Sequence, residues 1–221
     1  MDAERPSLLE RVWAQREVDV YPALFGDLGP GVYPIPIDVF TDMFRQSPDP
    51  RWLHIGVFAS PPNKQRDHTL YISTGFSNPW DADVVADASA PSGLGVEYVF
   101  ASRVAGEWAI KLMHRILAYD LLLSHDRYPG QEPLNVGHRI PLRAPIVPGT
   151  DSVLTRVLVG ATATLPSGFR LDSGTVRFLQ LIGITDDEAT LAREQGDEAL
   201  VRVLRQHGAY DVTDPRRPSL V

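Results

Sequence analysis

The chain has 221 residues, of which 43% are hydrophobic and 22% charged, with a formal net charge of -7 at pH 7. This composition is that of a globular protein and excludes a chain that is disordered throughout. The acidic balance argues against a nucleic-acid partner, which would need a surplus of Lys and Arg on one face, and it favours a basic protein partner. The sequence contains no Cys, which excludes a disulfide, a thiolate nucleophile and a zinc–thiolate site.

The length suits one domain, and we expect residues 1–221 to form a single domain with its own core. The first residues, 1–5, lack the basic and apolar segments of a secretory signal. No apolar run approaches the roughly 20 residues that span a bilayer. These features predict a cytoplasmic protein that does not use a membrane as a partner.

The first third of the chain is predicted to contain one helix and three strands. Apolar residues recur at helical spacing over residues 6–18, which predicts an amphipathic helix. Residues 21–36 are so rich in Pro and Gly that we expect a loop there. The three strands are expected at residues 37–44, 52–58 and 68–77.

The middle of the chain is dominated by one long apolar segment. An acidic loop is expected at residues 81–87, followed by a strand over residues 91–101 in which apolar residues alternate. The segment that begins at Glu107 has neither Gly nor Pro up to Leu123 and predicts a buried central helix. Its narrow polar stripe is expected to hold Glu107, Lys111, His114, Arg115 and Ala118.

Asp120 falls on the apolar side of this predicted helix, opposite the polar stripe. A buried carboxylate needs a partner, or it takes up a proton. The candidate partners are Arg103, Arg139 and Arg143. The alternative is a helix that frays by Tyr119 and leaves Asp120 in water.

The last third is predicted to hold a core strand followed by two helices. After a long Pro-rich and Gly-rich connection over residues 124–150, a strand is expected at 153–159 and a loop or ribbon at 161–173. Residues 174–184 form a continuous β-branched and aromatic run, typical of a central strand. Thr185 and Glu188 have the spacing of a capping box, so a helix should begin at Asp186 and end at Gly196. Asp197 is expected to cap the next helix, and residues 210–217 to add a short last strand.

Familiar catalytic motifs are missing from the sequence. It contains no phosphate-binding loop, dinucleotide fingerprint, zincin motif or Gly-x-Ser-x-Gly. Ser77 follows a predicted strand, but Pro79 stands where the second Gly of a nucleophile elbow would be. No two of the six His are three or four residues apart, so no helix presents a pair of imidazoles to a metal. We predict no catalytic residue, no metal and no cofactor, although a site assembled from distant residues stays open.

Six short pieces, in this order along the chain, resemble the suppressor of fused family. The pieces are residues 70–77 (LYISTGFS), residues 91–98 (PSGLGVEY), Trp108 with Leu112 and Met113, Gly137 with His138, residues 176–185 with Glu188, and residues 213–217 (TDPRR). The resemblance runs from about residue 37 to the C-terminus. It implies an α+β fold in which a mixed, largely antiparallel sheet packs against helices, as in the N-terminal lobe of the family.

The resemblance also implies how such a protein works. The animal member, a regulator of Hedgehog signalling, holds an extended segment of its partner between two lobes as an added strand, whereas this chain matches a single lobe. Single-lobe bacterial members look like immunity proteins that neutralise the toxin of a polymorphic toxin system by binding it. We therefore expect a non-catalytic protein-binding module, most of all an immunity protein. The alternatives are a regulatory or scaffolding protein that binds an extended peptide, and an enzyme with a dispersed site.

We expect the partner to bind at a free sheet edge, together with the long connection over residues 124–150. Animal members carry an acidic residue where this chain has Gly137, so that contact does not carry over. The candidate contact residues are Tyr128, His138, Arg139, Asp214, Arg216 and Arg217. The alternative for the connection is that it merely covers the core. For the last three residues, with Thr213, we predict a local polar lock, and partner contact is the other interpretation.

Overall fold

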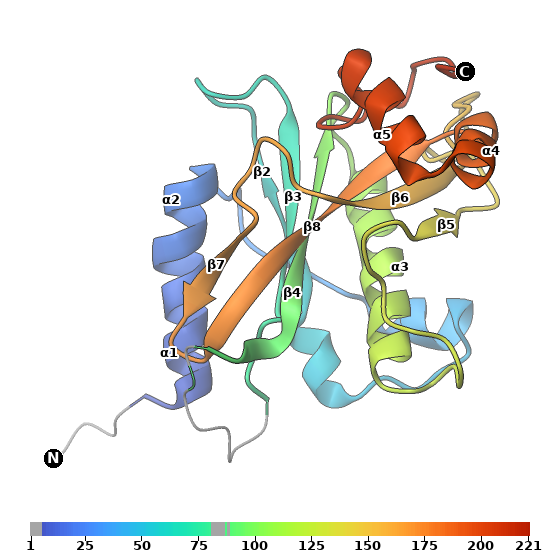
Figure 1. Ribbon diagram of the computed structural model, residues 1–221. Helices are drawn as coiled ribbons and strands as arrows, with labels where there is room; N and C mark the ends of the chain where they lie inside the picture. The colour runs from blue at the N-terminus through green and yellow to red at the C-terminus, as the bar shows by residue number, and fades with distance from the viewer. Residues whose placement is uncertain (1–5, 81–86, 88) are drawn as a thin grey trace, which may run out of the picture.

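The computed structural model describes residues 6–80, 87 and 89–221, and its centre is one mixed β-sheet (Figure 1). Within these residues the sheet has eight strands in the order β1-β2-β3-β4-β8-β6-β5, and β7 pairs with β8. Among the paired strands of the described residues, β4 and β8 run parallel and the other pairs are antiparallel. The strands are Tyr33–Pro34 (β1), Gly56–Ser60 (β2), Thr69–Thr74 (β3), Pro91–Ser102 (β4), Arg139–Pro141 (β5), Arg156–Ala161 (β6), Gly168–Leu171 (β7) and Gly174–Ile184 (β8).

Helices cover both faces of this sheet (Figure 1). An N-terminal helix runs through α1, a π-helical segment and α2, while α3 packs on the opposite face and α4 and α5 form a hairpin after β8. The helical segments are Leu8–Ala14 (α1), Gln15–Val20 (π), Tyr21–Phe25 (α2), Val39–Met43 (π), Pro50–His54 (3-10), Glu107–Ser124 (α3), Asp186–Gln195 (α4) and Asp197–Gln206 (α5). None of the described helices is long and apolar enough to cross a bilayer.

Strand β8 shows how the layers are divided. Phe178 packs with the N-terminal helix, and Ile182 packs with α4 and α5. Leu179 and Leu181 point the other way into the cluster around α3. This alternation follows from the two-residue period of a strand, and it buries β8 on both faces. The predicted α+β fold with a mixed, largely antiparallel sheet is confirmed.

Several predicted elements are confirmed in detail. β8 covers residues 174–184, and the Thr185 hydroxyl accepts from the Glu188 amide while the Glu188 carboxylate accepts from the Thr185 amide. α3 begins at Glu107 and reaches Ser124, so the alternative of fraying by Tyr119 is wrong. The predicted ribbon over 161–173 contains β7, and the tail adds a single parallel bridge between Ser102 and Thr213.

The strand predicted over residues 37–44 is wrong, because this segment contains a π-helix. Val39, Phe40 and Phe44 all pack on the cluster around α3. A strand would send neighbours such as Val39 and Phe40 to opposite faces, whereas a helical turn can bring all three to one side.

The predicted loop over residues 21–36 also needs correction at its start, where α2 continues the N-terminal helix. Tyr21 and Phe25 are buried against Phe58 and Phe178, so tertiary packing outweighs the Pro and Gly content. Pro22 stands at the start of α2, where a missing amide hydrogen is tolerated.

Three further boundaries differ from the prediction. β2 begins at Gly56 because residues 50–54 form a 3-10 helix, and β6 begins at Arg156 rather than at residue 153. Gly196, not Asp197, is the N-cap of α5, and no side chain caps this helix. Of the acidic loop predicted at 81–87, residues 81–86 lie outside the described part of the chain.

Candidate functional site

A groove of 740 Å³ lies beside the edge strand β5. The π-helical segment 39–43, α3 and the residues around β5 form its walls. Its lining is Met43, Phe44, Arg115, Ile116, Tyr119, Leu134, Gly137, His138, Arg139, Ile140, Pro141, Leu142 and Arg143. The groove therefore joins a free sheet edge to a partly apolar depression.

The backbone of β5 has hydrogen-bonding groups on its outer side. The Val159 amide donates to the His138 carbonyl at 2.8 Å, and the Leu142 amide donates to the Thr155 carbonyl at 2.9 Å. Antiparallel strands alternate between residues that bond the neighbour and residues that face away from it. Arg139 and Pro141 are thus the residues whose backbone groups face away from β6, and Pro141 has a carbonyl but no N–H to offer.

The side chains of the groove combine aromatic and basic groups. Phe44 stacks on Tyr119, with ring centroids 6.0 Å apart and planes 16° apart. Arg139 forms an ion pair with Asp197 at the start of α5. A methyl group at Gly137, whose φ is +94°, would come within 2.9 Å of the same Asp197 carboxylate. The groove wall is therefore tied to the α4–α5 hairpin.

Asp120 supports this wall from inside the protein. It is 1% exposed, its Oδ2 accepts from the Tyr98 hydroxyl at 2.6 Å, and its Oδ1 accepts from the Leu134 amide at 2.6 Å. Burial raises the pKa of Asp120, although these two hydrogen bonds oppose the rise. The prediction of a buried, paired carboxylate is confirmed, but the partners Arg103, Arg139 and Arg143 were wrong, because a phenol and a backbone amide satisfy it.

The polar stripe of α3 is narrower than predicted. Ala118 is buried, and His114 is buried with its Nε2 donating to the Tyr33 carbonyl at 2.9 Å. Burial lowers the pKa of His114. His114 therefore ties α3 to β1, while Glu107, Lys111 and Arg115 remain at the surface.

The structure places His138 and Arg139, of the predicted contact residues, in the groove lining. Tyr128 lies on the same connection, half-buried, with its ring centroid 6.1 Å from that of Tyr119. Tyr119 itself lines the groove, so three of the six predicted residues lie in or next to it. Their role in partner binding stays a prediction.

The other three predicted residues belong to the C-terminal tail. Arg217 binds both carboxylate oxygens of Glu188, at 2.5 and 2.6 Å, and the Gly183 carbonyl at 2.9 Å. Asp214 pairs with Arg216, and Arg216 is exposed. Arg216 and Arg217 line a separate groove of 500 Å³. Arg217 fastens the tail to α4, which agrees with the predicted local polar lock.

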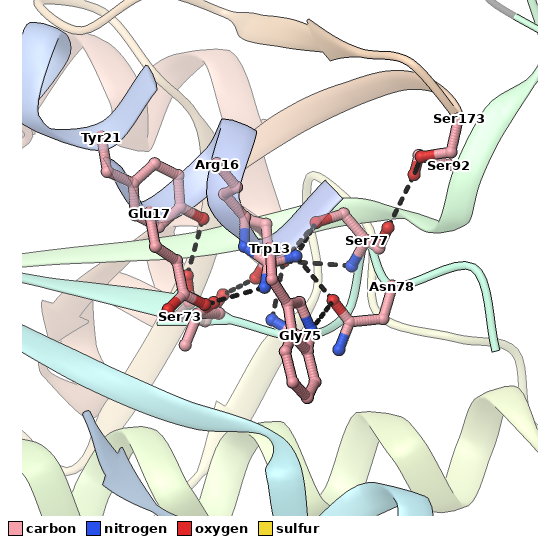
Figure 2. A network of polar contacts seen from close by, with 12 residues as sticks. Trp13, Arg16, Glu17, Tyr21, Ser73, Gly75, Ser77, Asn78, Ser92 and Ser173 are labelled. Carbon is pink, nitrogen blue, oxygen red and sulfur yellow. Dashed lines mark hydrogen bonds and ion pairs between the residues drawn. The ribbon is translucent and has the colours of Figure 1, made fainter. Parts of the chain in front are cut away.

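Sequence reasoning missed a buried polar network under the N-terminal helix (Figure 2). Arg16 is 1% exposed, and its guanidinium donates to Ser77 and Asn78 and pairs with Glu17 at 2.9 Å. Glu97 is fully buried 4.0 Å from Arg16, and it accepts from the Gly75 and Ser77 amides and from the Ser73 and Ser77 hydroxyls. Glu97 within an apolar strand was the one signal that could have indicated this network.

Some residues of the sequence pieces 70–77 and 91–98 have a structural role in or next to this network. Ser77 is fully buried and bonded to Glu97, so it is not placed as a nucleophile. Gly93 has φ of +55°, and a methyl group there would lie 2.6 Å from the carbonyl oxygens of Phe76 and Asn78. Within the described residues no three His, Cys, Asp or Glu side chains gather as metal ligands would.

These features define a class of α+β protein with one two-sided mixed sheet, a buried Arg–Glu network and a groove at the sheet edge. The family model for Suppressor of fused protein (SUFU) matches residues 51–218. The chain therefore belongs to the suppressor of fused family. The match begins after Arg16, so the N-terminal helix lies outside it.

Solved structures share this fold. A chain of the Sufu–Fu complex crystal structure is 23% identical, with a TM-score of 0.60, over 85% of this chain and 93% of that one. Drosophila Suppressor of Fused is 22% identical, with a TM-score of 0.59, over 86% of this chain and 52% of that one. A putative SUFU homolog from Neisseria gonorrhoeae is 19% identical, with a TM-score of 0.52, over 76% and 78%. No curated protein matches the chain significantly.

Proposed function

We propose that this chain is a protein-binding module that takes up an extended segment of a partner protein as an added strand on β5. The observation that carries the proposal is the free β5 edge next to the groove. A neighbour of the same fold is described as the Sufu–Fu complex, so binding of a protein has a precedent in this fold. The proposed role needs no catalytic residue.

Backbone pairing would supply affinity, because an incoming strand can bond the outward N–H and carbonyl of Arg139 and the carbonyl of Pro141. The edge is three residues long, so backbone bonds alone are few. Side chains of the incoming segment would add contacts with the groove, where Met43 is 48% exposed and Phe44 is half-buried. Such contacts at alternate positions would give specificity.

The test is a selection of displayed random peptides against the chain, followed by hydrogen exchange on the selected complexes. We expect protection of the β5 amides and of the connection over residues 124–150. Protection confined to α4, α5 or the N-terminal helix would contradict the proposed site, as would a selection without a specific binder.

A pair of variants tests the backbone contact itself. Arg139→Ala and Arg139→Pro both lose the ion pair with Asp197, but only Pro also removes the outward N–H. We expect the Pro variant to bind the selected peptides at least tenfold more weakly than the Ala variant. This difference corresponds to about 1.4 kcal/mol of binding free energy. Equal affinities would exclude this N–H as a docking group. Circular dichroism checks that both variants keep the fold.

For the biological role we propose neutralisation of a toxin in the cytoplasm, with a regulatory or scaffolding role as the second candidate. The support is the resemblance to single-lobe bacterial members and the neighbour from Neisseria gonorrhoeae. The experiment is co-expression with the toxin domain encoded nearest to its gene. Restored growth and a co-purified complex are expected, and loss of rescue by Arg139→Pro would tie the role to β5.

A further inference from the structure

We propose that the segment bound at β5 is acidic, with Asp or Glu side chains that enter the groove between apolar ones. This inference rests on the proposed function and adds the chemistry of the partner. Four groove residues are Arg or His, and among the residues that the structure describes the lining contains neither Asp nor Glu. The basic set is Arg115, His138, Arg139 and Arg143. The groove is thus locally basic on a chain whose net charge is -7.

Two of these cations are available to a partner. Arg115, on α3, is half-exposed, and Arg143, just after β5, is exposed. Neither forms an ion pair with any residue that the structure describes, whereas Arg139 is paired with Asp197. Arg143 has a φ of +60°, an uncommon conformation for a side chain of this size. Two guanidinium groups from different elements therefore line one groove, and no carboxylate of the described part of the chain lines it with them.

Two carboxylates near the groove, Asp120 and Asp197, are engaged elsewhere and do not cancel these charges. Asp120 lies behind the wall, where Tyr98 and the Leu134 amide occupy both of its oxygens. Asp197 is occupied by Arg139. Guanidinium groups bind carboxylates through paired N–H donors, and such bonds are stronger than those between neutral groups. A carboxylate is therefore the group that fits the free ends of Arg115 and Arg143.

The net charge of the chain and the local charge of the groove lead to opposite expectations about the charge of the partner. The net charge of -7 favours a basic partner at long range. Salt screens such fields beyond about 8 Å, so the groups in contact decide which segment is bound. The bound segment is accordingly acidic, even where the rest of the partner is basic.

The apolar part of the lining restricts the segment further. Met43, Phe44 and Ile140 lie in the same groove as the two free guanidinium groups. Side chains of an added strand alternate between its two faces, so every second residue faces the groove. We therefore expect the bound segment to carry Asp or Glu, together with apolar residues, at the alternate positions whose side chains face the groove.

The experiment compares the peptides that displayed random libraries yield with different variants as bait. The wild type should enrich Asp and Glu at alternate positions. The double variant Arg115→Glu/Arg143→Glu should bind these peptides at least tenfold more weakly. As bait, it should select peptides enriched in Lys and Arg instead. The matched control is Arg170→Glu/Arg202→Glu, which changes the net charge equally at two exposed Arg outside the groove and should leave the selection unchanged.

The outcomes separate this inference from the proposed function. Peptides that protect β5 in hydrogen exchange but are basic or neutral would overturn the acidic segment and leave strand addition intact. Acidic peptides that bind the control variant as weakly as the groove variant would show an effect of net charge and would also overturn it. Failure to protect β5 would overturn both proposals. Thermal unfolding of each bait confirms that the charge changes leave the fold in place.

Discussion

The Tyr98 hydroxyl on β4 donates a 2.6 Å hydrogen bond to Oδ2 of Asp120 on α3, and both groups are buried. The other oxygen of Asp120 accepts from the Leu134 amide, on the connection that leads to β5. One carboxylate therefore joins a central strand, the central helix and the wall of the groove.

Replacing Asp120 with Ala should destabilise the protein strongly. The change leaves the Tyr98 hydroxyl and the Leu134 amide buried without an acceptor, and each such group costs about 1–3 kcal/mol. We expect the free energy of unfolding, measured in urea, to fall by about 3 kcal/mol. Tyr98→Phe, which removes a single partner, should cost less. An unchanged urea midpoint for Asp120→Ala would contradict the burial of this carboxylate.

Asp120 should also make the free energy of unfolding decrease as the pH rises, which is opposite to the usual effect of an Asp side chain. Burial raises the pKa of its carboxyl above the usual range for Asp, so the folded state binds this proton more readily than the unfolded state. Its contribution is fully present below the unfolded pKa and is lost as the pH rises through the folded pKa. The stability of the wild type relative to Asp120→Asn should therefore fall as the pH rises above about 4, the ordinary pKa of Asp. A flat difference would contradict the raised pKa.

Arg16→Met should release the N-terminal helix. Arg16 is 1% exposed, and its removal leaves the Glu97 carboxylate buried without its nearby cation. Breaking a buried ion pair from one side costs about 3–5 kcal/mol. We expect a loss of this size, together with faster amide exchange over residues 8–25. The control is Arg170→Met at an exposed site, and equal effects of the two changes would refute the role of the network.

Two glycines with positive φ allow the cost of backbone strain to be distinguished from the cost of a steric clash. Gly93 and Gly149 have φ of +55° and +77°, but only at Gly93 would a methyl group meet backbone atoms, at 2.6 Å. The left-handed conformation alone costs a non-glycine residue about 1–2 kcal/mol. We expect Gly149→Ala to lower the unfolding free energy by about 1 kcal/mol and Gly93→Ala to lower it clearly more. Similar losses in thermal unfolding would mean that the close approach is relieved easily.

The ion pair between Arg217 and Glu188, which holds the C-terminal tail on α4, should contribute more to stability than the Thr185 cap of α4. Arg217→Met leaves Glu188, which is fully buried, without its cation, whereas Thr185→Ala removes the cap hydrogen bond from the Glu188 amide and a hydroxyl contact with Ser219. We expect losses of about 3 kcal/mol for Arg217→Met and about 1 kcal/mol for Thr185→Ala. A double-mutant cycle of Arg217→Met with Glu188→Gln measures the coupling directly. Additive effects would show that the pair does not stabilise the fold.

The sequence by itself determined the elements whose signals are local. β8 is rich in β-branched, aromatic and other apolar residues, the start of α4 depends on Thr185 and Glu188 three residues apart, and α3 has no helix breaker within it. Short-range spacing and side-chain chemistry are sufficient for such elements. The burial of Asp120 followed from the same reasoning, because helical periodicity alone places it opposite the polar stripe.

Only the tertiary structure decided the rest, because the partners are distant in the chain. Arg16 and Glu97 are 81 positions apart, and although Glu97 within an apolar strand indicates a buried carboxylate, the sequence does not identify Arg16 as its neighbour. Val39 and Phe40 are helical because α3 offers them one shared surface, which outweighs the preference of an apolar run for a strand. The basic character of the groove arises in the same way, since folding brings Arg115 of α3 and Arg143 into the lining of one groove while the net charge of the chain is negative.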